Sequence, residues 1–238
     1  MSEHTLYDRL APHYRDISSR RATYLAAVDA LILERARRPG PAFLDVGAAD
    51  GVRGLGLAGM LGASRVVFCE PSREMAAKCR QGAPRTVVWE CAAGDMPLDG
   101  GPFDNIVCLW NVLGHMPDTA ARTAALARMG DLLGPGGRLF LDVNNRHNAA
   151  AYGWWRVFGR RVVDALAFDE RRGDASYVTT VGGEAIAGMG HLFTPAEVDV
   201  LLSAAGLRVV ERLGVDYLTG RPAVSPRQGQ LFYSLERT

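Results

Sequence analysis

The chain has 238 residues, of which 48% are hydrophobic and 22% charged, and its formal net charge at pH 7 is +1. This composition is typical of a globular protein and excludes a disordered, collagen-like or disulfide-scaffold chain. Because the charge is balanced, no general attraction to duplex nucleic acid exists, and no DNA partner is expected.

The cysteines and the N-terminal residues indicate the compartment. Cys69, Cys79, Cys91 and Cys108 lie in or beside apolar runs and have no zinc-ligand spacing, so we expect free thiols and no metal site. Residues 1–16 contain no apolar segment of the signal-peptide kind, and no window has the apolar length of a membrane span. We therefore expect a soluble, cytoplasmic protein.

Helices and short buried strands alternate in the first two thirds of the chain. Helices are expected over about 6–38, 55–61, 71–80 and 118–133. Strands are expected at 41–47, 64–70, 86–91, 103–110 and 138–143. Strands that are apolar on both faces and alternate with helices indicate a parallel sheet covered on both sides, which is an α/β fold.

The last third has a different pattern. A short amphipathic helix is expected at 150–161, followed by a β-hairpin whose strands are 163–170 and 175–181. Thr194 and Glu197 form the sequence pattern of a capping box and start a helix over 194–206, and strands at 207–213 and 230–236 close the chain.

We expect a single domain over residues 1–238, without repeats or linkers. Its parts are an N-terminal helical cap (1–40), a ligand-binding core (41–145), an insertion (146–192), and a C-terminal helix with strands of the core (193–238).

Four short motifs follow the predicted strands. LDVGAADG (44–51) combines an acidic strand end with small residues that let a ligand lie against the backbone. Glu70 ends the second strand and is placed to accept both hydroxyls of a ribose. In AAGDM (92–96) the Asp can accept an adenine amine and the Met can cover the ring, and LWNVLGHM (109–116) follows the fourth strand. These positions are the carboxyl ends of parallel strands, where open α/β sheets bind ligands.

With these motifs the chain resembles the class I S-adenosylmethionine-dependent methyltransferases, across about 41–143 and again at 194–236. The signs are D-x-G-x-x-x-G from Asp45 to Gly51, Glu70, the Gly94-Asp95-Met96 run, Trp110-Asn111, and L-x-PGG before the fifth strand. The resemblance implies a Rossmann-like, seven-stranded, mostly parallel sheet with an antiparallel last strand, helices on both faces, and a β-hairpin or lid inserted after strand 5.

The resemblance also implies S-adenosyl-L-methionine as the cofactor. The residues expected to bind it are Asp45, Gly47, Ala49, Gly51, Glu70, Pro71, Asp95, Met96, Trp110 and Asn111. Two positions depart from the family pattern: Ala49 stands at the usual middle glycine, and Asp50 at the usual Ser or Thr. Both departures can lower cofactor affinity.

A second glycine motif competes with this interpretation. GLGLAG (54–59) matches the dinucleotide fingerprint G-x-G-x-x-G, which must directly follow a strand. Here it falls inside the first predicted helix after Gly47, so we interpret it as packing of helix on sheet rather than as NAD binding.

Catalysis of methyl transfer depends mainly on aligning the acceptor with the methyl group, which supplies roughly 7–11 kcal/mol. A general base adds roughly 10²–10⁴-fold when the acceptor must lose a proton. The candidates are His115, His191 and Tyr14, each of which also has a purely structural interpretation. Arg53, or Arg20 with Arg21, could bind the cofactor carboxylate.

Aromatic and basic residues gather after the fifth strand. Tyr152, Trp154 and Trp155 lie beside Arg156, Arg160 and Arg161. Three interpretations fit this stretch: an acceptor lid, a membrane-surface helix, or a stacking surface for nucleic acid. The family places acceptor specificity after strand 5, which favours the lid.

The sequence thus predicts a methyltransferase that acts on nitrogen or oxygen of a small molecule, in secondary metabolism. An RNA-nucleoside methyltransferase and a non-catalytic cofactor-binding scaffold are the alternatives, and a homodimer is left open.

Overall fold

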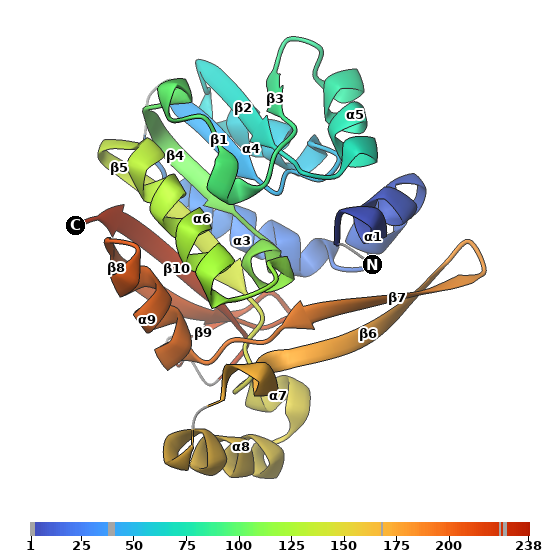
Figure 1. Cartoon of the computed structure of the whole chain (residues 1–238), viewed down its shortest axis with the longest axis vertical. Helices are drawn as coiled ribbons and strands as arrows, with labels where there is room; N and C mark the ends of the chain where they lie inside the picture. Colours follow the sequence, from blue (N-terminus) through green and yellow to red (C-terminus); the bar gives the residue numbers. More distant parts are fainter. Residues whose placement is uncertain (1–2, 38–40, 168, 224, 226–227) are drawn as a thin grey trace.

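A twisted mixed sheet forms the centre of the computed structural model, which describes residues 3–37, 41–167, 169–223, 225 and 228–238 (Figure 1). The order of its strands is β3-β2-β1-β4-β5-β10-β8-β9. Their bounds are β1 Ala42–Val46, β2 Arg65–Cys69, β3 Val87–Trp89, β4 Phe103–Cys108, β5 Leu133–Val143, β8 Leu207–Val215, β9 Pro222–Ala223 and β10 Gln230–Arg237.

Strand directions confirm the predicted sheet. Strands β1 to β5 are parallel to one another, and β10 is antiparallel to both of its neighbours, β5 and β8. The described sheet has eight strands instead of the predicted seven, because the two-residue β9 pairs with the end of β8 at Gly214 and Val215.

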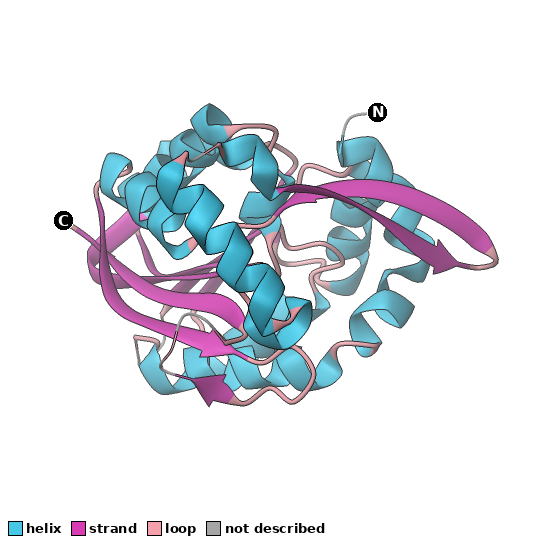
Figure 2. Cartoon of the chain, turned by 90° about the horizontal axis from the view of Figure 1, so that it is seen from below, coloured by secondary structure: helices cyan, strands magenta, loops and turns pink. Residues whose placement is uncertain are grey.

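Helices cover both faces of the sheet (Figure 2). On one face α3 (Ala22–Arg35) and α4 (Val52–Leu61) pack on side chains such as Phe43 and Phe232. On the other face α6 (Thr119–Leu132) and α9 (Pro195–Ala204) pack on their strand neighbours Leu44 and Leu231. Successive strand residues therefore enter opposite cores, as the period of a strand requires. Helix α5 (Arg73–Gly82) connects β2 to β3.

The predicted N-terminal helices are present as three short pieces. Helix α1 (Glu3–Leu10), the 3₁₀ turn η1 (Ala11–His13) and α2 (Tyr14–Ser19) precede α3, and the predicted end at Arg38 lies outside the described residues. Leu6 and Leu10 of α1 pack against Val181 and Ile186, which belong to a hairpin far along the chain.

The predicted hairpin is wrong in its pairing. Helix α7 (Ala149–Tyr152) is followed by α8 (Trp154–Leu166), which contains much of the expected first strand, and residue 168 lies outside the described residues. The strands that pair are β6 (Asp174–Val181) and β7 (Glu184–His191). Gly182 and Gly183 form the turn with φ of 57° and 82°, a conformation that glycine adopts without strain. The glycine-rich residues 182–190 therefore form the turn and most of the second strand.

The capping box at α9 is confirmed: Thr194 accepts from the Glu197 N–H, and the Glu197 carboxylate accepts from the Thr194 N–H.

Among the described helices, none is both long enough and apolar enough to cross a lipid bilayer.

Candidate functional site

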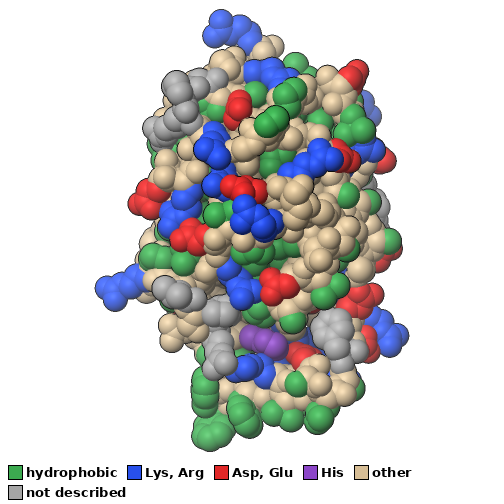
Figure 3. Space-filling model, turned by 90° about the vertical axis from the view of Figure 1, so that its left-hand side faces the viewer, with side chains coloured by type: hydrophobic (Ala, Val, Ile, Leu, Met, Phe, Trp, Pro, Cys, Tyr) green, Lys and Arg blue, Asp and Glu red, His purple; other side chains and the backbone are tan. Residues whose placement is uncertain are grey.

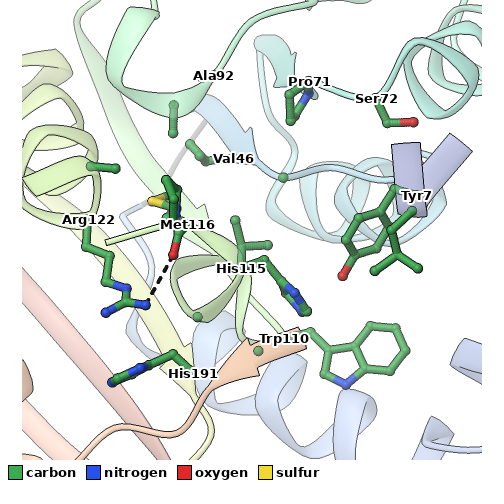
Figure 4. Close-up of a pocket in the computed structure, with 18 of the residues that line it drawn as sticks. Tyr7, Val46, Pro71, Ser72, Ala92, Trp110, His115, Met116, Arg122 and His191 are labelled. Atoms are coloured by element: carbon green, nitrogen blue, oxygen red, sulfur yellow. Dashed lines mark hydrogen bonds between the residues drawn. The ribbon is translucent and has the colours of Figure 1, made fainter. Parts of the chain in front are cut away.

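A cavity of about 950 Å³ lies at the carboxyl ends of β1, β2 and β4 (Figure 4). Its floor includes Gly47, Glu70 and Trp110, and its roof is formed by α1 and by strand β7 of the hairpin. This position is the ligand site expected of an open α/β sheet. The volume is near the upper end of the range for small-molecule sites.

The loops on the cavity floor hold unusual backbone conformations. Ala49, Trp110 and Asn111 have φ of 51°, 59° and 63°, and they are the only non-glycine residues with positive φ in the described chain. Gly47 has φ of 75°, and a Cβ there would lie 2.4 Å from Val112. Strained backbone gathers at ligand sites, where the surrounding structure holds it in place.

Glu70 organises the first of these loops. Its side chain is buried, and its two carboxylate oxygens accept from the N–H groups of Ala49 at 2.7 Å and Ser72 at 2.9 Å. Each carboxylate oxygen can accept a second hydrogen bond, so the group still has acceptor capacity for two hydroxyls on the cavity side. Burial raises the pKa of Glu70 from 4.5 to about 7, against the two backbone donors that lower it.

Asp45 supports the floor from below and does not line the cavity. Burial raises its pKa from 3.8 to about 7, and the charge of Arg53 opposes this rise. A Cβ at Gly54 would lie 2.2 Å from Asp45 Oδ2, so the first glycine of GLGLAG is needed where α4 packs on β1. The motif lies within α4, as the packing interpretation requires.

These raised pKa values predict a pH-dependent stability. In the folded, ligand-free protein Glu70 and Asp45 keep their protons up to about pH 7, whereas in the unfolded chain they release them near their ordinary values of 4.5 and 3.8. Their contribution is complete below those values and is lost as the pH rises through 7. We expect the Tm to fall between about pH 4.5 and pH 7, to level off above that, and to fall less in Glu70→Gln.

A matched control is Glu74→Gln on the exposed surface of α5, whose Tm should follow the wild-type pH dependence. Thermal unfolding monitored by circular dichroism measures the effect. A Tm difference between wild type and Glu70→Gln that stays constant over this pH range contradicts the assignment.

The other predicted cofactor residues divide into two groups. Gly47, Ala49, Pro71, Asp95 and Trp110 line the cavity together with Glu70. Three others lie behind its wall: Gly51, Met96 and Asn111.

Each residue behind the wall has a structural role. Gly51 begins α4 with φ of 74° and packs on Phe68. Met96, which follows the 3₁₀ turn η2 (Ala93–Asp95), is buried in the core that includes residues of α6 and does not line the cavity. The Asn111 side chain accepts from the Asn144 N–H and donates to the His191 carbonyl, which joins β4, β5 and the hairpin.

The predicted bases differ in their surroundings. His191 is buried, with Nδ1 2.7 Å from Asp174 and Nε2 2.7 Å from Glu197. Both ring nitrogens are thus engaged, and the residue ties β7 to the capping box of α9. Tyr14 lines the cavity with its ring edge against Trp110, and burial raises the pKa of its phenol well above the ordinary value. Such a phenol is a poor proton acceptor near neutral pH.

His115 lies in the 3₁₀ turn η4 (Val112–His115) and points into the cavity (Figure 4). It is half-buried, and its ring makes edge contacts with Tyr7 at 5.4 Å and Tyr177 at 6.3 Å between centroids. Two elements that are distant in sequence, α1 and β6, thus hold the imidazole at the cavity.

The basic residues suggested for the cofactor carboxylate do not line the main cavity. Arg53 forms an ion pair with Asp29 at 2.7 Å and lines a hollow of about 270 Å³, whose walls also include Tyr14 and Trp110. Arg21 lies over the ring of Tyr217, and Arg20 is exposed on the N-terminal segment.

Several site residues were not identified from the sequence. Asp142, at the end of β5, accepts from the Trp110 N–H and from the Tyr24 hydroxyl at 2.5 Å, so it holds the strained Trp110 loop. Burial raises its pKa. The sequence feature that could have identified Asp142 is an acidic residue within an otherwise apolar strand segment. The hairpin contributes Asp174, Ser176 and the backbone near Gly188, which no local pattern marked.

The prediction that Trp154 and Trp155 form an acceptor lid is wrong, and so is the alternative that they are core. Their side chains are 55% and 81% exposed on α8, and neither lines the cavity. Two of the nearby arginines are held by contacts within the protein: Arg146 is buried against Asp164, and Arg160 donates to the Arg146 carbonyl. No cluster of side chains among the described residues is suited to hold a metal ion.

Comparison with known proteins identifies the fold and one family model that resembles part of the chain. Residues 43–137 match a family model described as a methyltransferase domain. None of the curated proteins matches the sequence. DesVI of Streptomyces venezuelae has a TM-score of 0.66 at 18% identity, over 96% of this chain and 98% of that one.

Two further solved structures are similar along their whole length. CalS10, an amino pentose methyltransferase from Micromonospora echinaspora solved with bound S-adenosylmethionine, has a TM-score of 0.63 at 21% identity, over 95% of this chain and 97% of that one. KedS8, a sugar N-methyltransferase from a Streptoalloteichus species, has a TM-score of 0.61 at 21% identity, over 94% and 91%. At these identities the likeness establishes the shared fold.

Proposed function

Because residues 43–137 match a methyltransferase-domain family model and the chain has the fold of these enzymes, we propose that it transfers a methyl group from S-adenosyl-L-methionine to nitrogen or oxygen of a small molecule. The observation that carries the proposal is that one continuous cavity extends from Glu70 at the end of β2 to strand β7 of the hairpin. One end is suited to the cofactor, and the other is enclosed by the inserted elements.

The cofactor end is supported by its polar groups. The Glu70 oxygens retain acceptor capacity for the ribose hydroxyls, and Asp95 in η2 lines the wall where an adenine amine is expected. Gly47 and Ala49 bring backbone close to the ligand without large side chains. The bound cofactor supplies an electrophilic methyl group on a sulfonium, and the protein aligns the acceptor with it.

The acceptor end is supported by the hairpin. Asp174 and Ser176 of β6 and Met189 of β7 form a mixed polar and apolar wall. The Asp174 side chain is 43% exposed, so a carboxylate is available to an amine or hydroxyl of the acceptor. Enclosure by α1 and the hairpin favours a small molecule over RNA, and amino sugars are the first class to test, given the activities of CalS10 and KedS8.

His115 is the residue we propose as the general base. His115, His191 and Tyr14 all line the cavity, but His191 has carboxylates on both ring nitrogens and Tyr14 holds its proton. His115 would take the proton that an ammonium or hydroxyl acceptor must lose before or during attack on the methyl group.

The cofactor assignment predicts a selective thermal shift. S-adenosylhomocysteine should raise the Tm, and NAD should leave it unchanged, because only a ligand that binds the native state stabilises it. At a concentration of about 100 times Kd the stabilisation is about 2.7 kcal/mol. Differential scanning fluorimetry measures the Tm with each of the two ligands. Stabilisation by NAD alone would overturn the assignment.

Catalysis is tested separately from binding. The enzyme is incubated with labelled S-adenosylmethionine and a panel of amino and neutral sugars, and mass spectrometry detects transfer of the label. Cofactor binding without transfer to any acceptor, including single-stranded RNA, would favour the scaffold alternative.

A further inference from the structure

Helix α8 exposes an apolar stripe along its full length. Trp154, Phe158, Val162 and Leu166 recur every four residues and therefore lie on one side of the helix. Their exposed fractions are 55%, 53%, 43% and 82%, and the adjoining Trp155 is 81% exposed. We call these five residues the α8 stripe. Figure 3 shows hydrophobic side chains gathered at the lower end of the molecule, where α8 lies.

Such a surface differs from the scattered apolar residues of an ordinary protein exterior. Single exposed apolar side chains are common, but a contiguous set of large ones marks an interaction site. The stripe lies outside the cavity, since none of its residues lines it. The proposed methyl transfer therefore gives the stripe no role.

Charge on α8 is positive on the solvent side. Arg156 is exposed and Arg161 half-buried, and because about 3.6 residues complete a turn they lie on opposite sides of the stripe. The acidic residue of the helix, Asp164, is turned inward, where it accepts from Arg146 Nε at 3.1 Å and lies 3.0 Å from His147. Among the described residues, the solvent side of α8 thus presents arginine and no acidic group.

Acidic residues just beyond α8 are already engaged. In η5 (Glu170–Gly173) and the residue before it, Asp169 accepts from Arg171, and Glu170 accepts from Thr119. Arg172 donates to the Ala167 carbonyl at the end of the α8 segment. Asp169 and Glu170 balance the charges of Arg171 and Arg172, so this segment adds no net charge, and the positive charge beside the stripe comes from α8 itself.

This arrangement discriminates between partners. In a two-fold pair of α8 helices, the stripe with Arg156 and Arg161 would meet a second surface of the same composition, which offers no exposed carboxylate to pair with them. An anionic lipid surface supplies the missing charges and accepts the apolar stripe between its headgroups. Tryptophan at the start of the stripe suits that interface, because its ring is apolar and its N–H is polar.

We propose that α8 is a membrane-surface helix that docks this protein on an anionic lipid bilayer through the α8 stripe, with Arg156 and Arg161 at the headgroups. The helix lies along the surface and does not cross it. A single helix of this length gives reversible attachment that depends on salt.

The test uses the full-length protein in flotation assays with vesicles of phosphatidylglycerol mixed with phosphatidylcholine, and of phosphatidylcholine alone. We expect binding to the anionic vesicles, weakened by high salt, and little binding to the neutral ones. The double variant Trp155→Ser/Leu166→Ser should lower the affinity more than about tenfold, because two large apolar side chains no longer enter the interface. Both side chains are exposed, so folding is preserved.

Leu218→Ser is the matched control, since Leu218 is 76% exposed but lies outside α8, and it should bind vesicles like wild type. Sedimentation velocity is run on the same proteins. Failure of the wild type to bind anionic vesicles overturns the proposal. A wild-type dimer that becomes monomeric in the double variant, without vesicle binding, would assign the stripe to a second copy of the chain.

Discussion

Replacing Glu70 with glutamine should weaken S-adenosylhomocysteine binding by roughly 10- to 150-fold, or about 1.5–3 kcal/mol, because charge-assisted bonds to the ribose are lost. The same carboxylate accepts the Ala49 N–H, so the variant also loosens the loop that carries the positive φ of Ala49. Isothermal titration calorimetry at about pH 8, where the wild-type carboxylate is ionised, measures the loss.

The pH dependence separates this role from a structural one. Since the pKa of Glu70 is about 7 in the ligand-free protein, the wild-type affinity should fall about tenfold for each pH unit below 7. The affinity of Glu70→Gln should change little over the same range, and Glu74→Gln should behave like wild type. Equal affinities of Glu70→Gln and wild type at pH 8 would show that the ribose is bound elsewhere.

His115→Ala should lower kcat by roughly 10²–10⁴-fold while the affinity for S-adenosylhomocysteine stays close to that of wild type. The reason is that the imidazole lines the cavity beside the acceptor wall, whereas the cofactor contacts proposed above come from the loops after β1, β2 and β3. Single-turnover kinetics with an accepted substrate measure the chemical step directly.

A second histidine provides the control for this prediction. His147 lies outside the cavity, where its Nε2 is 3.0 Å from Asp164, so the kcat of folded His147→Ala should remain that of wild type. An unchanged kcat in His115→Ala would instead mean that alignment alone drives the reaction and that His115 only packs against Tyr7 and Tyr177.

Local sequence patterns determined most of the central sheet. The strands that end at Val46, Cys69 and Cys108 are short apolar runs between helices, and such runs are typical of buried parallel strands. The ligand end of the sheet follows from the same pattern, because the carboxyl ends of parallel strands lie together. Glu70 and Asp95 could therefore be placed at one cavity from the sequence.

Pairing between distant segments could not be obtained in this way. The strand at 174–181 was recognised, but its partner depends on which neighbour meets it in space, and the glycine content of 184–191 hid that strand. The same limit applies to His191. Its two carboxylate partners, Asp174 and Glu197, are brought together only when the hairpin reaches α9.

The orientation of α8 shows the difference most clearly. Its sequence determined an amphipathic helix, because apolar residues recur at helical spacing. Which side faces the protein was decided by tertiary contacts: Asp164 pairs with the buried Arg146, and Val157 is buried, so the tryptophan side is turned outward. A periodic pattern specifies that a helix has two faces, but burial of one face requires a partner surface, and that surface is built from residues far away in the chain.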